Sequence, residues 1–425
     1  MIEKLKTFAL VLLIGGSLFQ SYMLAYSSPN LDPVLQSDYV QTETLGAQKK
    51  LEDMLFPDHI IVHMGNNQHT VLYPGNYSYR SLVDNIKQRS IEGFRKTSQF
   101  LGTINWEDVK NKYQGVEFRF RDGVPINVLQ KLLQVKGDLP VENDIITRIW
   151  IFKNGETEDI RTFLFTDSPS TIYEVVKADF TSKDVEKFVS NYGNVYDLYL
   201  PGNGDYYLPV KPIRTMVYTF KYKRFTAEQL KRSLFVDPGI TRNLKERDGS
   251  EIYTDAKRGL QISKDQLWFN YSDPVASVES NIDVRENLQS GVQFVNQHGG
   301  WDGIYSLSRT PLRQTFSNQT FIFRQYYENY PIIDEGFGTI KLIVQKGIVS
   351  AYERSMIIPD PKSVTHIDVT LPSASELADR LKNYQKASSI ISIFPAYRPF
   401  IKEDTVVLAP VWALEFRDGT VDFIQ

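Results

Sequence analysis

The chain opens with one long apolar stretch and continues with many short segments in which apolar and polar residues alternate. Residues 8–26 carry no charge and follow Lys4 and Lys6. A helix of about 20 apolar residues spans a bilayer core of about 30 Å. Positive charge on the N-terminal side keeps that end in the cytoplasm. The pattern predicts a cytoplasmic segment at residues 1–6, a transmembrane helix at 7–26 and an extracellular remainder.

A cleaved signal peptide is the alternative interpretation of the same stretch. The densest apolar part, residues 8–19, is short enough for the hydrophobic region of such a peptide. The small residues Ala25 and Ser27 around Tyr26 match a cleavage site poorly. We therefore expect an uncleaved anchor, and both interpretations export the rest of the chain.

The remainder has the pattern of a sheet-rich α+β protein. Residues 116–121 and 216–222 alternate in the period of two that half-buried strands show. A strand followed by a capped helix recurs, for example where Thr226 and Gln229 form a capping box. We expect mostly antiparallel sheets with packed helices. Helices are predicted at 44–55, 79–94, 125–133, 181–190, 226–235, 282–298 and 373–386, and strands at 58–64, 116–120, 173–180, 216–225, 321–327, 338–345, 348–356, 406–416 and 421–424.

Stretches dense in turn-forming residues suggest several domains, as a chain of 425 residues requires. Residues 27–40 contain two prolines and no helical period, so we expect a linker there. Residues 201–205 and 272–280 mark two further boundaries. The predicted domains are 41–208, 209–275 and 276–425.

Composition narrows the function further. The net charge is −3, which argues against nucleic-acid binding because that requires a concentrated basic face. The chain has no cysteine, so an exported form gains no disulfides and depends on buried area and sheet pairing.

Candidate chemistry is sparse. His59 and His63 lie four residues apart on one face of a predicted strand, and His69 could approach them across a hairpin. The sequence between them lacks the glutamate of the HExxH zinc motif, so we interpret them as polar positions on an exposed strand face and expect no metal. The chain also lacks a GxSxG nucleophile elbow and a P-loop, and we predict no catalytic residue and no cofactor.

Two stretches in the last third carry a family resemblance. Arg324, Gln325, Tyr326 and Tyr327 precede a Tyr-Pro-Ile segment at residues 330–332. The sequence LAPVW at residues 408–412 precedes an Asp-Gly turn. With a short basic N-terminus, one apolar stretch and a cysteine-free remainder, the chain resembles the YycH proteins. The same stretches are similar to PepSY-type exported modules.

The resemblance implies a regulator and not an enzyme. YycH proteins are membrane-anchored extracytoplasmic companions of YycI, and they tune the WalK sensor kinase of the WalK/WalR two-component system of Gram-positive bacteria. The expected partners are therefore a WalK-type histidine kinase and a YycI-type protein, with a homodimer also considered and no small-molecule ligand expected. The resemblance further implies a YycI-like C-terminal part at 276–425.

Small and polar residues in the apolar stretch suggest where a partner helix would contact it. Small side chains let two membrane helices approach closely, and a glutamine is costly when it faces lipid. Arginine and tyrosine are enriched in protein interfaces. The predicted partner-binding residues are Gly16, Ser17, Gln20, Ser21 and Leu24 in the helix, and Arg324 and Tyr326 in the ectodomain.

The sequence is also compatible with two other functions. An exported cell-envelope hydrolase would require a cleft with a positioned nucleophile or metal. A PepSY-like inhibitor or chaperone of an exported enzyme would bind a protease and not a kinase.

Overall fold

The computed structural model forms two compact units, Met1–Thr42 and Glu43–Gln425, which are described separately. The linker predicted at residues 27–40 and the boundary predicted at 275/276 lie outside the described residues. The described residues are 2–26, 46–98, 104–139, 144–155, 159–168, 170–193, 196–202, 204–274, 284–309, 319–334 and 336–425.

The first unit contains one helix, α1 (Ile2–Tyr26). A helix therefore covers the whole apolar stretch, as expected. Within the described residues, however, no helix is both long enough and apolar enough to cross a membrane. The transmembrane helix predicted at residues 7–26 is thus confirmed as a helix but not as a span.

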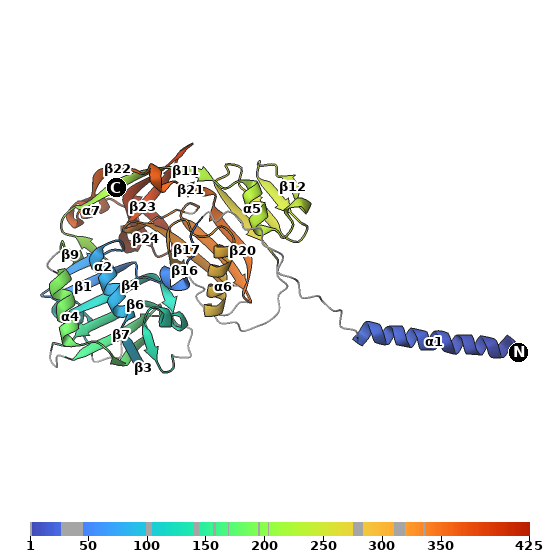
Figure 1. The fold of residues 1–425 in the computed structure, drawn as a ribbon. Helices are drawn as coiled ribbons and strands as arrows, with labels where there is room; N and C mark the ends of the chain where they lie inside the picture. Colours follow the sequence, from blue (N-terminus) through green and yellow to red (C-terminus); the bar gives the residue numbers. More distant parts are fainter. Residues whose placement is uncertain are drawn as a thin grey trace. The chain divides into compact units, whose positions relative to one another are not determined.

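The first half of the second unit folds into a ten-stranded sheet (Figure 1). Its strands follow the order β10-β9-β2-β1-β4-β6-β7-β8-β3-β5, and only the β3–β5 pair is parallel among the described strand pairs. Asn66 and Asn67 both have positive φ (53° and 56°), which gives the β1–β2 hairpin the twist of a two-residue turn. The strands are β1 (His59–Gly65), β2 (Gln68–Leu72), β3 (Ser90–Thr97), β4 (Gln114–Pro125), β5 (Gln134–Lys136), β6 (Ile145–Lys153), β7 (Ile160–Thr166), β8 (Ile172–Ala178), β9 (Tyr199–Pro201) and β10 (Tyr207–Pro209).

The second half contains two more sheets, and both combine strands from before and after residue 275. The six-stranded sheet consists of β11 (Ile213–Arg224), β21 (Ile357–Pro359), β22 (Thr365–Leu371), β23 (Ile390–Ile401), β24 (Thr405–Phe416) and β25 (Val421–Ile424). The nine-stranded sheet consists of β12 (Arg242–Lys245), β13 (Glu251–Thr254), β14 (Gly259–Ile262), β15 (Trp268–Ser272), β16 (Ile304–Arg309), β17 (Gln319–Tyr327), β18 (Tyr330–Pro331), β19 (Thr339–Gln345) and β20 (Ile348–Ser355).

Several helices pack against sheet faces, and two of them begin at capping boxes that the sequence predicts. Thr226 and Ser373 each form a capping box with the residue three positions later, Gln229 and Glu376. Helix α6 (Val284–Gln297) ends just before Gly299 and Gly300, which both have positive φ, as is common after a helix end. The α-helices of the second unit are α2 (Tyr77–Lys87), α3 (Trp106–Lys112), α4 (Ser182–Phe188), α5 (Ala227–Leu234), α6 (Val284–Gln297) and α7 (Ala374–Leu381), and the short 3₁₀ and π turns are η1 (Leu51–Met54), η2 (Ile126–Lys131), η3 (Val189–Gly193), η4 (Pro238–Ile240), η5 (Pro361–Ser363) and η6 (Ala387–Ser389).

Four predicted helices were wrong in length or type, and the one predicted at 373–386 ends at Leu381. The helix predicted at 44–55 is reduced to the single turn η1, and residues 47–50 before it are not helical. The helix predicted at 79–94 ends at Lys87, and its last apolar residues belong to β3. The helix predicted at 125–133 is the 3₁₀ segment η2. In each place apolar spacing was compatible with an α-helix, but tertiary contacts decided the structure.

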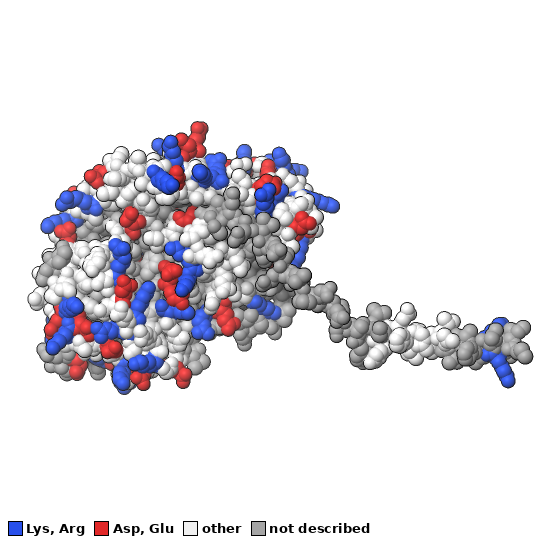
Figure 2. Space-filling model, in the orientation of Figure 1, with Lys and Arg blue, Asp and Glu red and all other residues white. Residues whose placement is uncertain are grey.

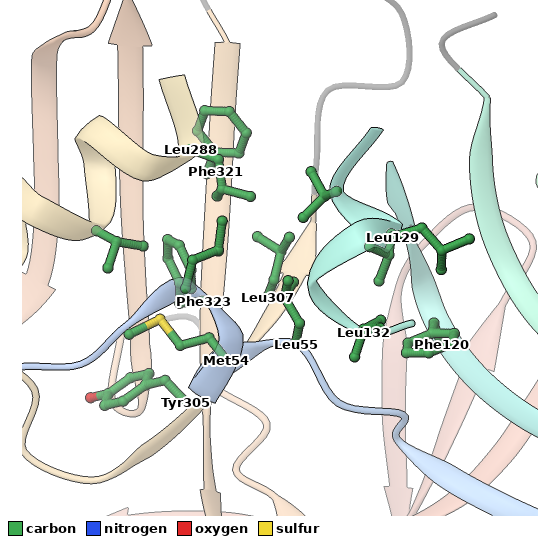
Figure 3. Packing of buried hydrophobic residues seen from close by; sticks show 14 of the residues in the cluster. Met54, Leu55, Phe120, Leu129, Leu132, Leu288, Tyr305, Leu307, Phe321 and Phe323 are labelled. Atoms are coloured by element: carbon green, nitrogen blue, oxygen red, sulfur yellow. The ribbon is translucent and has the colours of Figure 1, made fainter. Parts of the chain in front are cut away.

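One hydrophobic core joins the ten-stranded and nine-stranded sheets. Met54 and Leu55, each 1% exposed, lie between side chains of the two sheets (Figure 3). On one side they face the nine-stranded sheet, and on the other the turn η2 beside β4. The neighbours labelled in Figure 3 are Leu288, Tyr305, Leu307, Phe321 and Phe323 on the first side, and Phe120, Leu129 and Leu132 on the second.

The segment before η1 is also fixed to the nine-stranded part by a close backbone contact. Ala47 and Trp301 form an antiparallel bridge with hydrogen bonds of 2.9 Å in both directions. A Cβ atom on Gly46 would lie 2.4 Å from the Trp301 backbone, so only glycine fits there. The bridge holds the chain just before η1, whose residues Leu51 and Met54 belong to the shared core.

We expect the Leu55→Ala substitution to lower the free energy of unfolding by about 2–5 kcal/mol, because it opens a cavity at the junction of the two sheets. Leu244→Ala, at a leucine that is 54% exposed on β12, is the matched control and should change it by less than about 0.5 kcal/mol. Urea unfolding of the purified chain measures both. Equal effects of the two substitutions would contradict the role of Leu55 in the shared core.

Candidate functional site

Strand pairing brings together two of the three histidines of the β1–β2 hairpin. His63 lies directly opposite His69 in the β1–β2 register, and both are 0% exposed. Their Nδ1 atoms are 3.0 Å apart. On its other side β1 pairs with β4, which places Glu117 within 3.2 Å of His63 Nε2. The approach of His69 across a hairpin is thus confirmed.

Glu117 is the centre of a buried charge network. Arg119 donates to both of its carboxylate oxygens, from Nε at 3.0 Å and from Nη2 at 3.1 Å. Arg148 of β6 lies 3.2 Å from the same carboxylate. Both arginines also form ion pairs with Asp205. The positive charges of Arg119 and Arg148 therefore balance the negative charges of Glu117 and Asp205.

The hydrogen bonds define where the protons lie. An ionised Glu117 only accepts, so His63 must donate from Nε2. A neutral His63 then accepts at Nδ1, and His69 donates from its own Nδ1. His69 Nε2 then becomes an acceptor, and the atom 3.3 Å from it is Asn67 Oδ1. This tautomer therefore requires the Asn67 amide to be turned by 180°, so that its NH₂ group donates to His69.

Burial and neighbouring charges shift the pKa values in this network. Burial disfavours the cationic form and lowers the pKa of His63, against the opposing effect of Glu117. Burial also lowers the pKa values of His59 and His69, each to about 3. Burial alone would raise the pKa of Glu117, but Arg119 and Arg148 outweigh it and hold that pKa well below its usual range.

The interpretation of these histidines as polar positions on an exposed strand face was wrong. Both faces of β1 are covered, and Trp150 stacks on the His63 ring at 5.2 Å between centroids. No group of three or more histidines, cysteines or carboxylates among the described residues is arranged to hold a metal ion. The arrangement can keep Glu117 ionised inside the protein and fix which ring nitrogen of His63 carries the proton.

A cavity of about 330 Å³ lies above this network, between the ten-stranded sheet and β23 and β24. Its walls include the Tyr207 hydroxyl, which is buried and has no hydrogen-bond partner among the described residues. Polar and charged side chains of both signs line it. They are His59, Arg119, Arg121, Thr147, Arg148, Thr166, Asp167, Asp205, Ser392 and Glu415.

The structure places Arg324 and Tyr326 at the junction of the two large sheets. Tyr326 is 4% exposed, and its hydroxyl donates to Asp58 Oδ1 at 2.5 Å. The same carboxylate accepts the backbone N–H of Arg121 at 2.6 Å. Arg324 is partly buried on β17 and donates to the carbonyl of Ile332 at 3.2 Å. Both side chains are thus occupied inside the molecule.

Tyr326 also lines a second, mostly apolar cavity of about 350 Å³. Phe220 and Tyr327 pack edge to face there at 4.9 Å between centroids, and Leu408 closes the wall. The charged residues that line this cavity are Arg80, Asp302 and Glu328.

The predicted contact residues of the first unit lie on helix α1. The side chains of Ser17, Gln20 and Ser21 are exposed, and Gly16 has open space where a Cβ would stand. Leu24 lies in the last turns of the same helix. Their contact with a partner stays a prediction.

Sequence reasoning missed Glu117, Arg119, Arg148, Asp205 and Tyr207. Glu117 and Arg119 alternate with apolar residues in a strand, which normally indicates a solvent-facing side. Glu117 and Arg119 pair with each other on β4, but their further partners His63, Arg148 and Asp205 lie elsewhere in the chain. The sequence carried no local signal for those longer-range pairs.

We expect the free energy of unfolding to fall between pH 6.5 and pH 4. The folded chain keeps His69 neutral, with a pKa near 3, while the unfolded chain protonates it below its ordinary value of 6.5. Each such histidine contributes a slope of up to about 1.4 kcal/mol per pH unit. The slope should decrease in His69→Asn, whose amide keeps a donor towards His63. The exposed His366→Asn is the control, and urea unfolding at several pH values measures the slopes. An equal slope in both variants would contradict the assignment.

We expect Tyr326→Phe to lower the free energy of unfolding by about 1–3 kcal/mol, because Asp58 loses a buried donor. Tyr77→Phe is the control, since that side chain is 78% exposed. Thermal unfolding of both variants provides the measurement. If Tyr326→Phe is as stable as the control, Tyr326 does not hold the two sheets together.

Comparison with known proteins identifies the family to which the chain belongs. Residues 3–194 match the family described as YycH protein, N-terminal domain, and residues 203–425 match YycH protein, C-terminal domain. The two-component system WalR/WalK regulatory protein YycH of Bacillus subtilis (strain 168) is 20% identical over 439 residues, covering 97% of this chain and 94% of that protein. The crystal structure of YycH from Bacillus subtilis has a similar fold, with a TM-score of 0.69 at 18% identity over 89% of this chain and 98% of that one. The chain belongs to the YycH family.

Proposed function

We propose that this protein regulates a WalR/WalK-type two-component system by contact with other proteins. The observation that carries the proposal is the full-length match to a protein named as a WalR/WalK regulator, covering 97% of this chain. The site geometry is compatible with this role, because the buried acids and bases pair with one another. Such pairing favours a fixed shape over proton transfer to a substrate.

The N-terminal unit is the proposed contact with the kinase. Residues 8–26 are uncharged, helical and preceded by Lys4 and Lys6, which supports an anchor with its N-terminus in the cytoplasm and the second unit outside the cell. Gly16, Ser17, Gln20, Ser21 and Leu24 would face the partner helix. A contact changes kinase output only if it differs between two kinase states.

The second unit is the proposed site for a YycI-type partner. Its C-terminal part, residues 276–425, is proposed to be YycI-like on the strength of the two sequence stretches described above. Basic and acidic side chains are interspersed over the face shown in Figure 2. A surface of this kind favours a partner selected by shape over one attracted by a single sign of charge.

We expect the full chain to change the activity of a WalR-dependent reporter in a Gram-positive host that lacks its own YycH protein. Replacing residues 8–26 with an unrelated membrane anchor should remove part of that effect. Reporter activity and WalR phosphorylation are measured together at matched protein levels. No effect of the full chain would overturn the regulatory proposal, whereas an unchanged effect of the anchor swap would overturn only the helix contact.

The face of the helix is tested by a matched pair of glycine substitutions. Gly15 and Gly16 both have open space where a Cβ atom would stand, so leucine is equally acceptable within the chain at either position. We expect Gly16→Leu to weaken the reporter effect by at least about threefold and Gly15→Leu, on the other side of the helix, to leave it unchanged. Equal effects of both substitutions would contradict the assigned face.

A further inference from the structure

Strand β22 has an edge that no strand among the described residues covers. It pairs with β11 along its whole length, from Thr365 opposite Thr219 to Leu371 opposite Ile213. Its other edge is open, and Ile367 in its middle is 70% exposed. An open edge of this length is a template for a further strand.

β22 lacks the features that usually block an edge. It has no proline and no lysine, and its pairing with β11 shows no register shift. Other outer strands are shorter or contain blocking residues: β5, β10 and β21 have three residues each, β16 has six, and β12 has four, two of which are basic. The longer outer strand β23, with twelve residues, contains Pro395 and Pro399. Figure 1 places β22 at the margin of the six-stranded sheet.

The sequence of β22 is complementary to itself. When two copies run antiparallel with Ile367 opposite Ile367, His366 of each copy lies opposite Asp368 of the other. An imidazole N–H donates to a carboxylate, and the two-fold symmetry makes this contact twice. Asp368 makes no ion pair within the described part of the chain, so it is available for that contact.

The two faces of the strand agree with this register. Successive side chains point to opposite faces, so Ile367 shares one face with Thr365 and Val369, and the two polar residues occupy the other. Val217 of β11 lies beside Ile367 and is only partly buried. An added copy would extend both the apolar face and the polar face without placing like charges opposite each other.

We propose that two copies of this chain associate by antiparallel pairing of their β22 strands about a two-fold axis at Ile367. The interface is isologous, because each strand contributes the same residues to it. A seven-residue strand pair is a small contact, so association is weak in dilute solution and increases when both copies are confined to one surface. The inference stands independently of the proposed regulatory function.

Cysteine crosslinking tests the register, and the natural chain contains no cysteine to interfere. In the proposed pair the Cα atoms of residue 367 lie about 4.5–5.5 Å apart, within the range for a disulfide. Under mild oxidation the purified full chain with Ile367→Cys should give at least about fivefold more disulfide dimer than Val176→Cys, His366→Cys or Asp368→Cys. Val176 is the matched control, because it is 62% exposed on an internal strand. Equal yields from all four variants would overturn the proposal.

A charge exchange tests the complementarity separately. His366→Asp places two carboxylates opposite each other at both ends of the pair and should lower the dimer fraction at least about threefold in sedimentation. Adding Asp368→Lys to it restores opposite charges and should restore the dimer. Both residues are exposed, so circular dichroism should show unchanged folding. A chain that remains monomeric at all concentrations, or a dimer indifferent to both changes, would overturn the proposal.

Discussion

The second unit depends on one packing constraint: the chain segment around Met54 and Leu55 fills the space between two large sheets. Each sheet has an apolar face that must be covered, and here each covers the other through this short segment. Because the chain has no disulfides, burial and pairing provide its cohesion. Around the shared core, the Asp58–Tyr326 hydrogen bond and the Ala47–Trp301 bridge tie the same two regions together.

The buried charge network is the second constraint, and it acts on shape more than on stability. Removing charges from water costs free energy that the pairing of Glu117 with two arginines repays only with good geometry. The geometry here is good, since that carboxylate accepts from Arg119 and His63 and forms an ion pair with Arg148 at 3.2 Å. Such a network admits few alternative strand registers, because a shift of one residue would leave a charge buried without a partner. It therefore fixes how β1, β4 and β6 align.

Much of the fold could be predicted from local sequence, and the predictions failed where contacts between distant parts of the chain decide the structure. Capping residues and turn glycines are local signals, and they correctly placed the starts of α5 and α7 and the end of α6. Apolar spacing alone could not separate the end of α2 from the start of β3, because Ile91 and Phe94 fit either period. The charge network was not predictable, since Arg148 and Asp205 reach Glu117 and Arg119 only through the tertiary arrangement of the chain. The placement of Tyr326 inside a junction likewise followed from tertiary packing, which the motif around it did not reveal.

These constraints also bear on how such a molecule can recognise a partner. Its charges are nearly balanced overall, and the strongest ones cancel within the molecule, so long-range electrostatic attraction is small. The two cavities described above are both walled in part by strands of the six-stranded sheet. Two kinds of surface remain for recognising a partner. Open strand edges are directional, because each unpaired N–H and C=O needs a partner. Helix faces with small side chains allow another helix to approach closely. A regulator built in this way would distinguish partners by their geometry. Because the protein is rigid, a bound partner would be held in a fixed orientation relative to it.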